Sequence, residues 1–76
     1  AAIAPLAANE ELRTTLAVYL EGGGSIESCA RALFVHPNTV RYRLRRVSEI
    51  TALEPADPRD ALVLRTAVIV GRLDEH

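Results

Sequence analysis

Lysine, methionine and tryptophan are absent from the 76 residues of this chain, and cysteine occurs once. A single cysteine cannot form a disulfide within the chain, so the composition favours a reducing compartment, the cytoplasm. Cys29 lies among expected core positions and is interpreted as a small buried hydrophobe. Because Cys29 and His36 have no companion ligands, we expect no metal ion. No apolar run approaches the roughly 18 residues of a membrane span, so no membrane contact is expected.

Acidic side chains are absent from a long central stretch. Residues 28–48 contain five arginines, at positions 31, 41, 43, 45 and 46, and no acid, whereas the rest of the chain contains four arginines and ten acids. The net charge of −1 is therefore the sum of +5 in this block and −6 outside it. Because the distribution of charge matters more than its sum for binding a polyanion, the block predicts nucleic acid as a partner.

The apolar residues recur with a helical period, which predicts an all-α domain. The expected N-caps are Asn9, Ser25, His36 and Asp57. Asp60 adds a weak capping pattern after Asp57, and Gly22–Gly24 end the first helix. The predicted helices, about four in number, span approximately residues 9–21, 26–33, 37–51 and 58–73. A chain this short has room for one core, so residues 9–76 are expected to form one domain and residues 1–8 the end of a linker or a short N-terminal extension.

The expected helix 37–51 has two different faces. At about 100° per residue its apolar side chains gather on one side and polar ones on the other. The apolar side consists of Val40, Leu44, Val47 and Ile50. The polar side consists of Asn38, Arg41, Tyr42 and Arg45, whose amide, guanidinium and phenol groups can read base edges and hold phosphates. Arg46 is expected at the edge of the polar side. Arg43 is nearer the core, where it either bridges to an acid or contacts a phosphate.

A short helix, a three-residue turn at 34–36 and a second helix with a polar outer face indicate a helix-turn-helix. Ala30 is small enough for the two helices to approach closely. The residues expected to fix the angle between them are Leu33, Val35, Val40 and Leu44. We therefore expect helix 37–51 to enter the major groove of double-stranded DNA with its N-terminal half.

The runs Ala30–His36 and Asn38–Leu44 resemble the C-terminal DNA-binding domain of the PucR/CdaR family of bacterial transcriptional regulators, through Leu-Phe-Val-His, Asn-Thr and Arg-Tyr-Arg-Leu. The likeness extends over nearly the whole chain. It implies the output domain of a longer cytoplasmic regulator, with an upstream sensory region, DNA as the target and a dimer as the working form. The positions that match the recognition helix are Asn38, Thr39, Arg41, Tyr42 and Arg45. Arg46 is added as a DNA contact, and His36, Pro37 and Arg43 are further candidates.

Two positions bear on how the helices end. Family members often carry glycine where Ala52 stands, because a left-handed residue there ends the third helix. We predict that the third helix is under-capped at its C-terminus, and that Ala52 or a neighbour, if forced to a positive φ, costs stability relative to glycine. Many helix-turn-helix proteins outside this family also place glycine in the turn, where this chain has Phe34. The bulky residue agrees with the family and not with the general pattern.

The expected helix 58–73 is apolar on nearly every side, with a narrow polar stripe at Arg65 and Arg72. A helix of this kind needs burial on more than one side, which so small a domain cannot supply. We therefore expect an association surface, used in a homodimer. The alternative function is a protein-interaction module that uses this helix and carries an inert helix-turn-helix. An enzyme is not expected, because the sequence has no paired-carboxylate pocket and no nucleophile beside a base, and no cofactor is expected either.

Overall fold

The computed structural model describes the backbone of residues 9–74 and the side chains of residues 9–69. The chain forms four helices, which are α2 (Glu10–Glu21), α3 (Ile26–Leu33), α4 (Pro37–Thr51) and α5 (Pro58–Asp74). No strand occurs among the described residues, so the all-α prediction is confirmed, and each helix end lies within one residue of its expected place. Residues 1–8, expected to be the end of a linker or a short N-terminal extension, lie outside the described residues.

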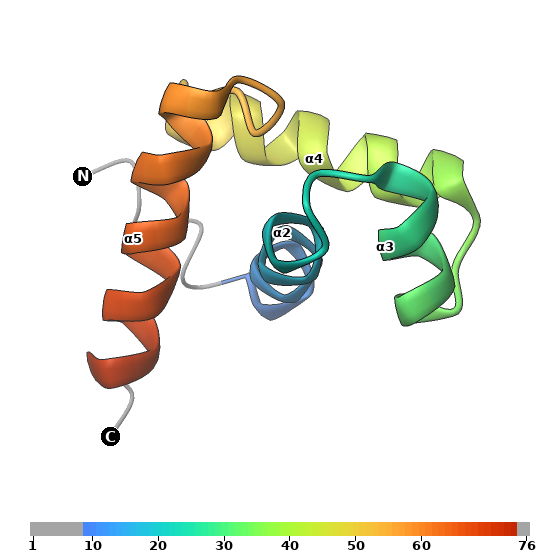
Figure 1. Ribbon diagram of the computed structural model, residues 1–76, viewed down its shortest axis with the longest axis horizontal. Helices are drawn as coiled ribbons and strands as arrows, with labels where there is room; N and C mark the ends of the chain where they lie inside the picture. The colour runs from blue at the N-terminus through green and yellow to red at the C-terminus, as the bar shows by residue number, and fades with distance from the viewer. Residues whose placement is uncertain (1–8, 75–76) are drawn as a thin grey trace.

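Helix α2 lies at the centre of the fold and contacts all three other helices. In Figure 1, α4 runs across one side of α2, while α3 and α5 lie on opposite flanks. The core is built from apolar side chains of every helix. The most deeply buried are Leu16, Cys29, Val40, Val47 and Leu64, none more than 1% exposed. Within the described part of the chain, no helix has the length and apolar character needed to cross a membrane.

Side-chain caps begin each helix as expected, with one difference at α5. Asn9 Oδ1 accepts from Leu12 N, Ser25 Oγ from Ser28 N, His36 Nδ1 from Asn38 N, and Asp57 Oδ2 from Asp60 N, all at 3.0–3.1 Å. The expected second half of the capping pattern at Asp57 is wrong. The Asp60 carboxylate accepts from the N–H of Glu54 at 2.9 Å, because the Asp57 N–H already donates to the Glu54 carbonyl.

Two helices end in left-handed residues that are not glycine. Phe34 closes α3 with φ of 58°, and Ala52 closes α4 with φ of 60°. The Val35 N–H donates to the Ala30 carbonyl and the Phe34 N–H to the Arg31 carbonyl, the pattern of a Schellman cap. At the end of α4, Ala52 itself takes the positive φ that was expected of it or a neighbour. Phe34 is also 94% exposed, so it combines backbone strain with an unburied aromatic ring.

We expect Ala52→Gly to raise the free energy of unfolding by about 1 kcal/mol, because glycine takes a positive φ without the steric cost of a Cβ. Thermal unfolding followed by circular dichroism measures this as a rise in Tm of a few degrees. Ala32→Gly, at an exposed position inside α3, is the matched control and should lower stability by a similar amount. A loss of stability in both variants would contradict the interpretation of the Ala52 cap.

Candidate nucleic-acid interface

Helix α4 has one buried face and one exposed face, as its period predicts. Val40 and Val47 are fully buried and Leu44 is 8% exposed. On the outer side, the exposed residues are Asn38, Arg41, Tyr42, Arg45 and Arg46, and Thr39 is half-buried beside them. Tyr42 is 59% exposed, so its phenol is available at the surface rather than packed in the core. The groups that chemistry links to DNA therefore lie on one accessible surface, called here the outer face of α4.

Helix α3 holds α4 in the geometry of a helix-turn-helix. Ala30 is 3% exposed, and its small side chain allows α3 to lie close against α4. Leu33 and Val35 are half-buried and pack against the core, which includes Val40 and Leu44, the other two residues expected to fix the angle between the helices. Pro37 is the first residue of α4, and the His36 imidazole caps it through Nδ1. These contacts fix how α3 and α4 pack against each other.

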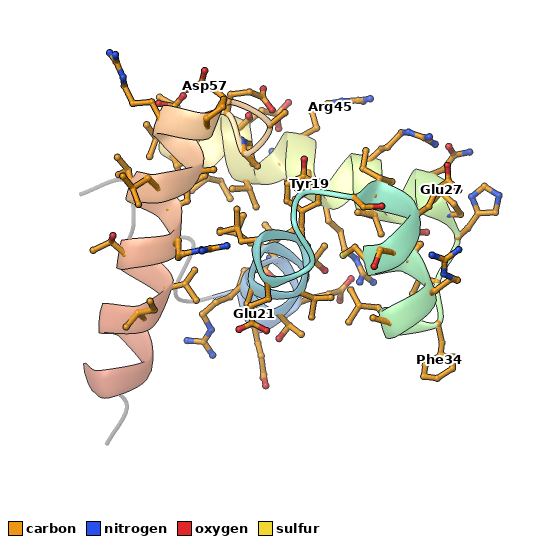
Figure 2. The ribbon with its side chains drawn as sticks, viewed as in Figure 1. Tyr19, Glu21, Glu27, Phe34, Arg45 and Asp57 are labelled. Carbon is orange, nitrogen blue, oxygen red and sulfur yellow. The ribbon has the colours of Figure 1, made fainter. Side chains whose placement is uncertain are left out.

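The arginines of α4 differ in what they already bind. Arg41 Nη1 donates to Asn38 Oδ1 at 2.9 Å, and Arg46 forms an ion pair with Glu49 one turn further along the helix. Arg45 makes no hydrogen bond or ion pair to any described residue, and its side chain extends away from the helix in Figure 2. Arg45 therefore offers an uncommitted guanidinium on the outer face.

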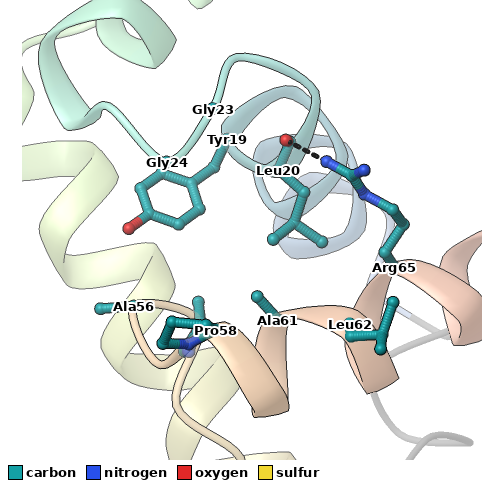
Figure 3. Close-up of a pocket in the computed structure, with 10 residues that line it drawn as sticks. Tyr19, Leu20, Gly23, Gly24, Ala56, Pro58, Ala61, Leu62 and Arg65 are labelled. Atoms are coloured by element: carbon teal, nitrogen blue, oxygen red, sulfur yellow. Dashed lines mark hydrogen bonds between the residues drawn. The ribbon is translucent and has the colours of Figure 1, made fainter.

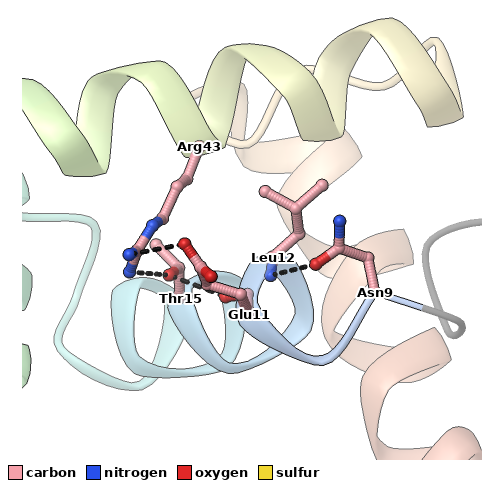
Figure 4. Close-up of polar contacts among 5 residues, drawn as sticks. All are labelled: Asn9, Glu11, Leu12, Thr15 and Arg43. Atoms are coloured by element: carbon pink, nitrogen blue, oxygen red, sulfur yellow. Dashed lines mark hydrogen bonds and ion pairs between the residues drawn. The ribbon is translucent and has the colours of Figure 1, made fainter.

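Arg43 contacts α2 instead of solvent. Its Nη2 lies 2.6 Å from Glu11 Oε1, its Nη1 donates to Thr15 Oγ1 at 3.2 Å, and the side chain is only 18% exposed (Figure 4). Thr15 Oγ1 in turn donates to the Glu11 carbonyl. Two roles were considered for Arg43, and the structure shows the first of them, the bridge to an acid. The bridge ties the inner side of α4 to the central helix.

Two residues of this region were not singled out by the sequence. Thr15 is fully buried in α2. Its position three residues after Leu12 puts it on the apolar side of the helix, and this spacing could have predicted its burial. Glu54 lies in the turn after α4, beside the exposed face, and nothing local in the sequence indicates that placement. Tyr19 and Glu54 line the same groove; burial raises the pKa of the Tyr19 phenol, and the negative charge of Glu54 raises it further.

Cys29 has the surroundings of a packing residue. It is 1% exposed, and its Sγ–H points to the Thr15 carbonyl at 3.6 Å. Burial raises the pKa of the thiol, so it stays protonated and unreactive at neutral pH. Among the described residues, no group of three potential ligands gathers in a way that suits a metal ion.

Helix α5 presents a second surface. Leu64 and Val68 face the core, but Leu62, Val63 and Ile69 are 66%, 49% and 52% exposed. These three side chains are called here the α5 flank. Arg65 attaches the helix to α2 by donating to the Leu20 carbonyl at 2.7 Å (Figure 3). The described part of α5 is therefore anchored along one side and apolar on another.

Comparison with known proteins agrees with this architecture. A protein of Mycobacterium tuberculosis is 59% identical over 71 residues, which are 92% of this chain and 17% of that protein. The purine catabolism regulatory protein of Bacillus subtilis is 40% identical over 65 residues, 86% of this chain and 12% of that protein. The chain thus spans less than a fifth of the length of either relative.

A crystal structure of a regulator of polyketide synthase expression from Bifidobacterium adolescentis superimposes with a TM-score of 0.78. It is 50% identical in sequence, and the match covers 82% of this chain and 26% of that structure. The family model for the PucR C-terminal helix-turn-helix domain matches residues 12–70 of this chain. That segment contains α3, the turn and α4 in full, together with nearly all of α2. The chain therefore belongs to the family of PucR C-terminal helix-turn-helix domains.

Proposed function

We propose that this domain binds double-stranded DNA with sequence specificity, with α4 in the major groove, as the output domain of a bacterial transcriptional regulator. The observation that carries the proposal is the outer face of α4, which is exposed, rich in arginine and free of acid as far as Ser48. A helix about 10–12 Å wide fits the major groove, which is about 12 Å wide. Family membership supports DNA-binding regulation as the general activity.

Within this proposal the residues have different roles. Arg41 and Arg45 can each fork onto O6 and N7 of guanine, and Asn38 can bind the edge of adenine. Thr39 and Tyr42 lie beside them and complete the contact surface. Arg46, at the side and already paired with Glu49, is placed against a phosphate. His36 and Pro37 lie at the end of the helix nearest the groove, and Arg43 is assigned to the bridge with Glu11.

The proposal is tested by measuring DNA binding at several salt concentrations. Each phosphate contact contributes about −0.9 to the slope of log K against log salt, so a DNA reader loses affinity steeply as salt rises. The variant with Arg41, Arg45 and Arg46 all changed to alanine should lose binding and keep its helical circular dichroism, because the three side chains are exposed. Unchanged binding by that variant would show that α4 is not the reader.

Self-association is a second candidate function, favoured by the exposed α5 flank. Exposed apolar patches mark interfaces, and a two-fold contact between identical copies is the commonest solution. A homodimer through α5 would present two copies of α4 to two half-sites, as dimeric helix-turn-helix proteins do. A sensory region elsewhere in the longer protein and a cytoplasmic location are part of the same proposal. Selection of bound sites from random DNA by the longer protein should recover an inverted repeat.

A further inference from the structure

We infer that Glu54, in the turn between α4 and α5, acts as a specificity-determining residue that weakens binding to non-cognate DNA. The inference rests on the proposed DNA-binding function. It concerns a residue outside the recognition helix, and its effect is opposite in sign to that of the arginines. The turn consists of residues 52–57, between the end of α4 and the first residue of α5.

Glu54 shares a groove with the arginines of the outer face. The groove has a volume of about 260 Å³. Arg41, Arg45 and Ser48 line it from α4, and Glu54, Pro55 and Ala56 line it from the turn. In Figure 2, Arg45 and Asp57 lie along the same edge of the molecule, and the shared groove puts the turn next to the outer face of α4. DNA that approaches Arg45 therefore also approaches the turn.

The carboxylate of Glu54 is held in position. Its Oε2 accepts from Ser48 Oγ at 3.2 Å, and its Oε1 accepts from the Ala56 N–H at 3.4 Å. The N–H of Glu54 donates to the Asp60 carboxylate, which fixes the backbone as well. The side chain is exposed and has no ion pair with a described arginine, although Arg45 lines the same groove. A fixed and uncompensated negative charge thus borders the outer face of α4.

This charge acts on phosphates that pass close to the turn. In salt of physiological strength the interaction extends over about 8 Å, so it reaches the nearest backbone and little beyond. A cognate complex is held in one register by base contacts, whereas a non-cognate complex rests mainly on phosphate contacts and samples several positions. Positions that bring a phosphate against the turn are disfavoured by Glu54. Its charge should therefore lower the affinity for random DNA more than the affinity for the cognate site.

The test compares Glu54→Gln with wild type on the selected site and on random duplex. At low salt we expect Glu54→Gln to bind random DNA about threefold more tightly and to lose part of its discrimination. The gain should shrink as salt rises, which a purely structural effect would not do. Glu54→Asp keeps the charge and should behave like wild type. Glu10→Gln makes the same charge change on α2, which packs on the inner side of α4, and should leave binding unchanged.

Ala56→Lys provides a second variant that leaves every Glu54 side chain contact in place. Ala56 is exposed and lines the same wall of the groove, so the added cation should raise affinity for random DNA. The inference is overturned if Glu54→Gln binds random DNA like wild type, or if Glu54→Asp behaves like Glu54→Gln. Failure of the wild-type chain to bind any DNA would instead overturn the proposed function.

Discussion

Arg45→Ala is expected to cost about 1–3 kcal/mol of binding free energy on the cognate site and to relax the preference at one base pair. Arg45 is exposed, lies on the outer face of α4 and makes no hydrogen bond or ion pair with any described residue. Its guanidinium can therefore donate two hydrogen bonds to a guanine without first giving up a hydrogen bond or ion pair within the domain. Arg41→Ala should also lower affinity and relax the preference at a neighbouring base pair. Arg41 differs in that its hydrogen bond to Asn38 must break before it contacts a base.

Arg46→Ala is the control within the same helix. Because the proposal assigns Arg46 to a phosphate contact, its loss should weaken all sequences alike and reduce the salt slope by about one. Binding of each variant to a panel of site variants at two salt concentrations separates the two patterns. The assignment of roles is wrong if Arg46→Ala changes base preference while Arg41→Ala and Arg45→Ala do not.

Ile69→Asp is expected to convert an associated chain into a monomer while leaving it folded. Ile69 is 52% exposed in the single chain, so a charge there costs little in the monomer, but in a paired interface it would be buried without a partner. Sedimentation equilibrium should show a lower apparent mass for Ile69→Asp than for wild type. Leu62→Asp, seven residues earlier on the same side of α5, should give the same result.

Ala32→Asp is the control for self-association, because it adds the same charge at an exposed position of α3. It should keep the apparent mass of wild type. A wild-type chain that remains monomeric at high concentration would contradict the proposed dimer, and the α5 flank would then need another partner. Unfolding of Ile69→Asp, seen as a loss of helical circular dichroism, would show that the side chain supports the monomer more than its exposure indicates.

The helix ends were predictable from the sequence because each has a local cause. Asn9 and Ser25 cap the helix that follows directly, and Pro55 shortly after Ala52 leaves α4 little room to continue. The two faces of α4 were predictable for a similar reason, since a period of 3.6 residues sorts side chains without reference to the rest of the fold.

Contacts between distant segments were not predictable in the same way. The choice between two roles for Arg43 depended on Glu11 and Thr15, which are 32 and 28 residues away in the chain. The position of Glu54 depends on how α5 docks on α2, through Leu64 and the bond from Arg65 to the Leu20 carbonyl. The Asp60 carboxylate had two possible donors nearby, and the turn geometry selected Glu54 over Asp57.

The central place of α2 has a consequence for protein engineering. The three glycines at 22–24, two of them with positive φ, look like a boundary at which a helix-turn-helix could be excised or fused. Helices α3 and α4 nevertheless share their core with α2, and the Arg43 bridge holds α4 to it. A fragment that begins at the glycines would lack α2, so the inner side of α4 would be exposed and the orientation of α4 would not be fixed. The smallest transferable DNA reader in this fold should therefore begin at the Asn9 cap.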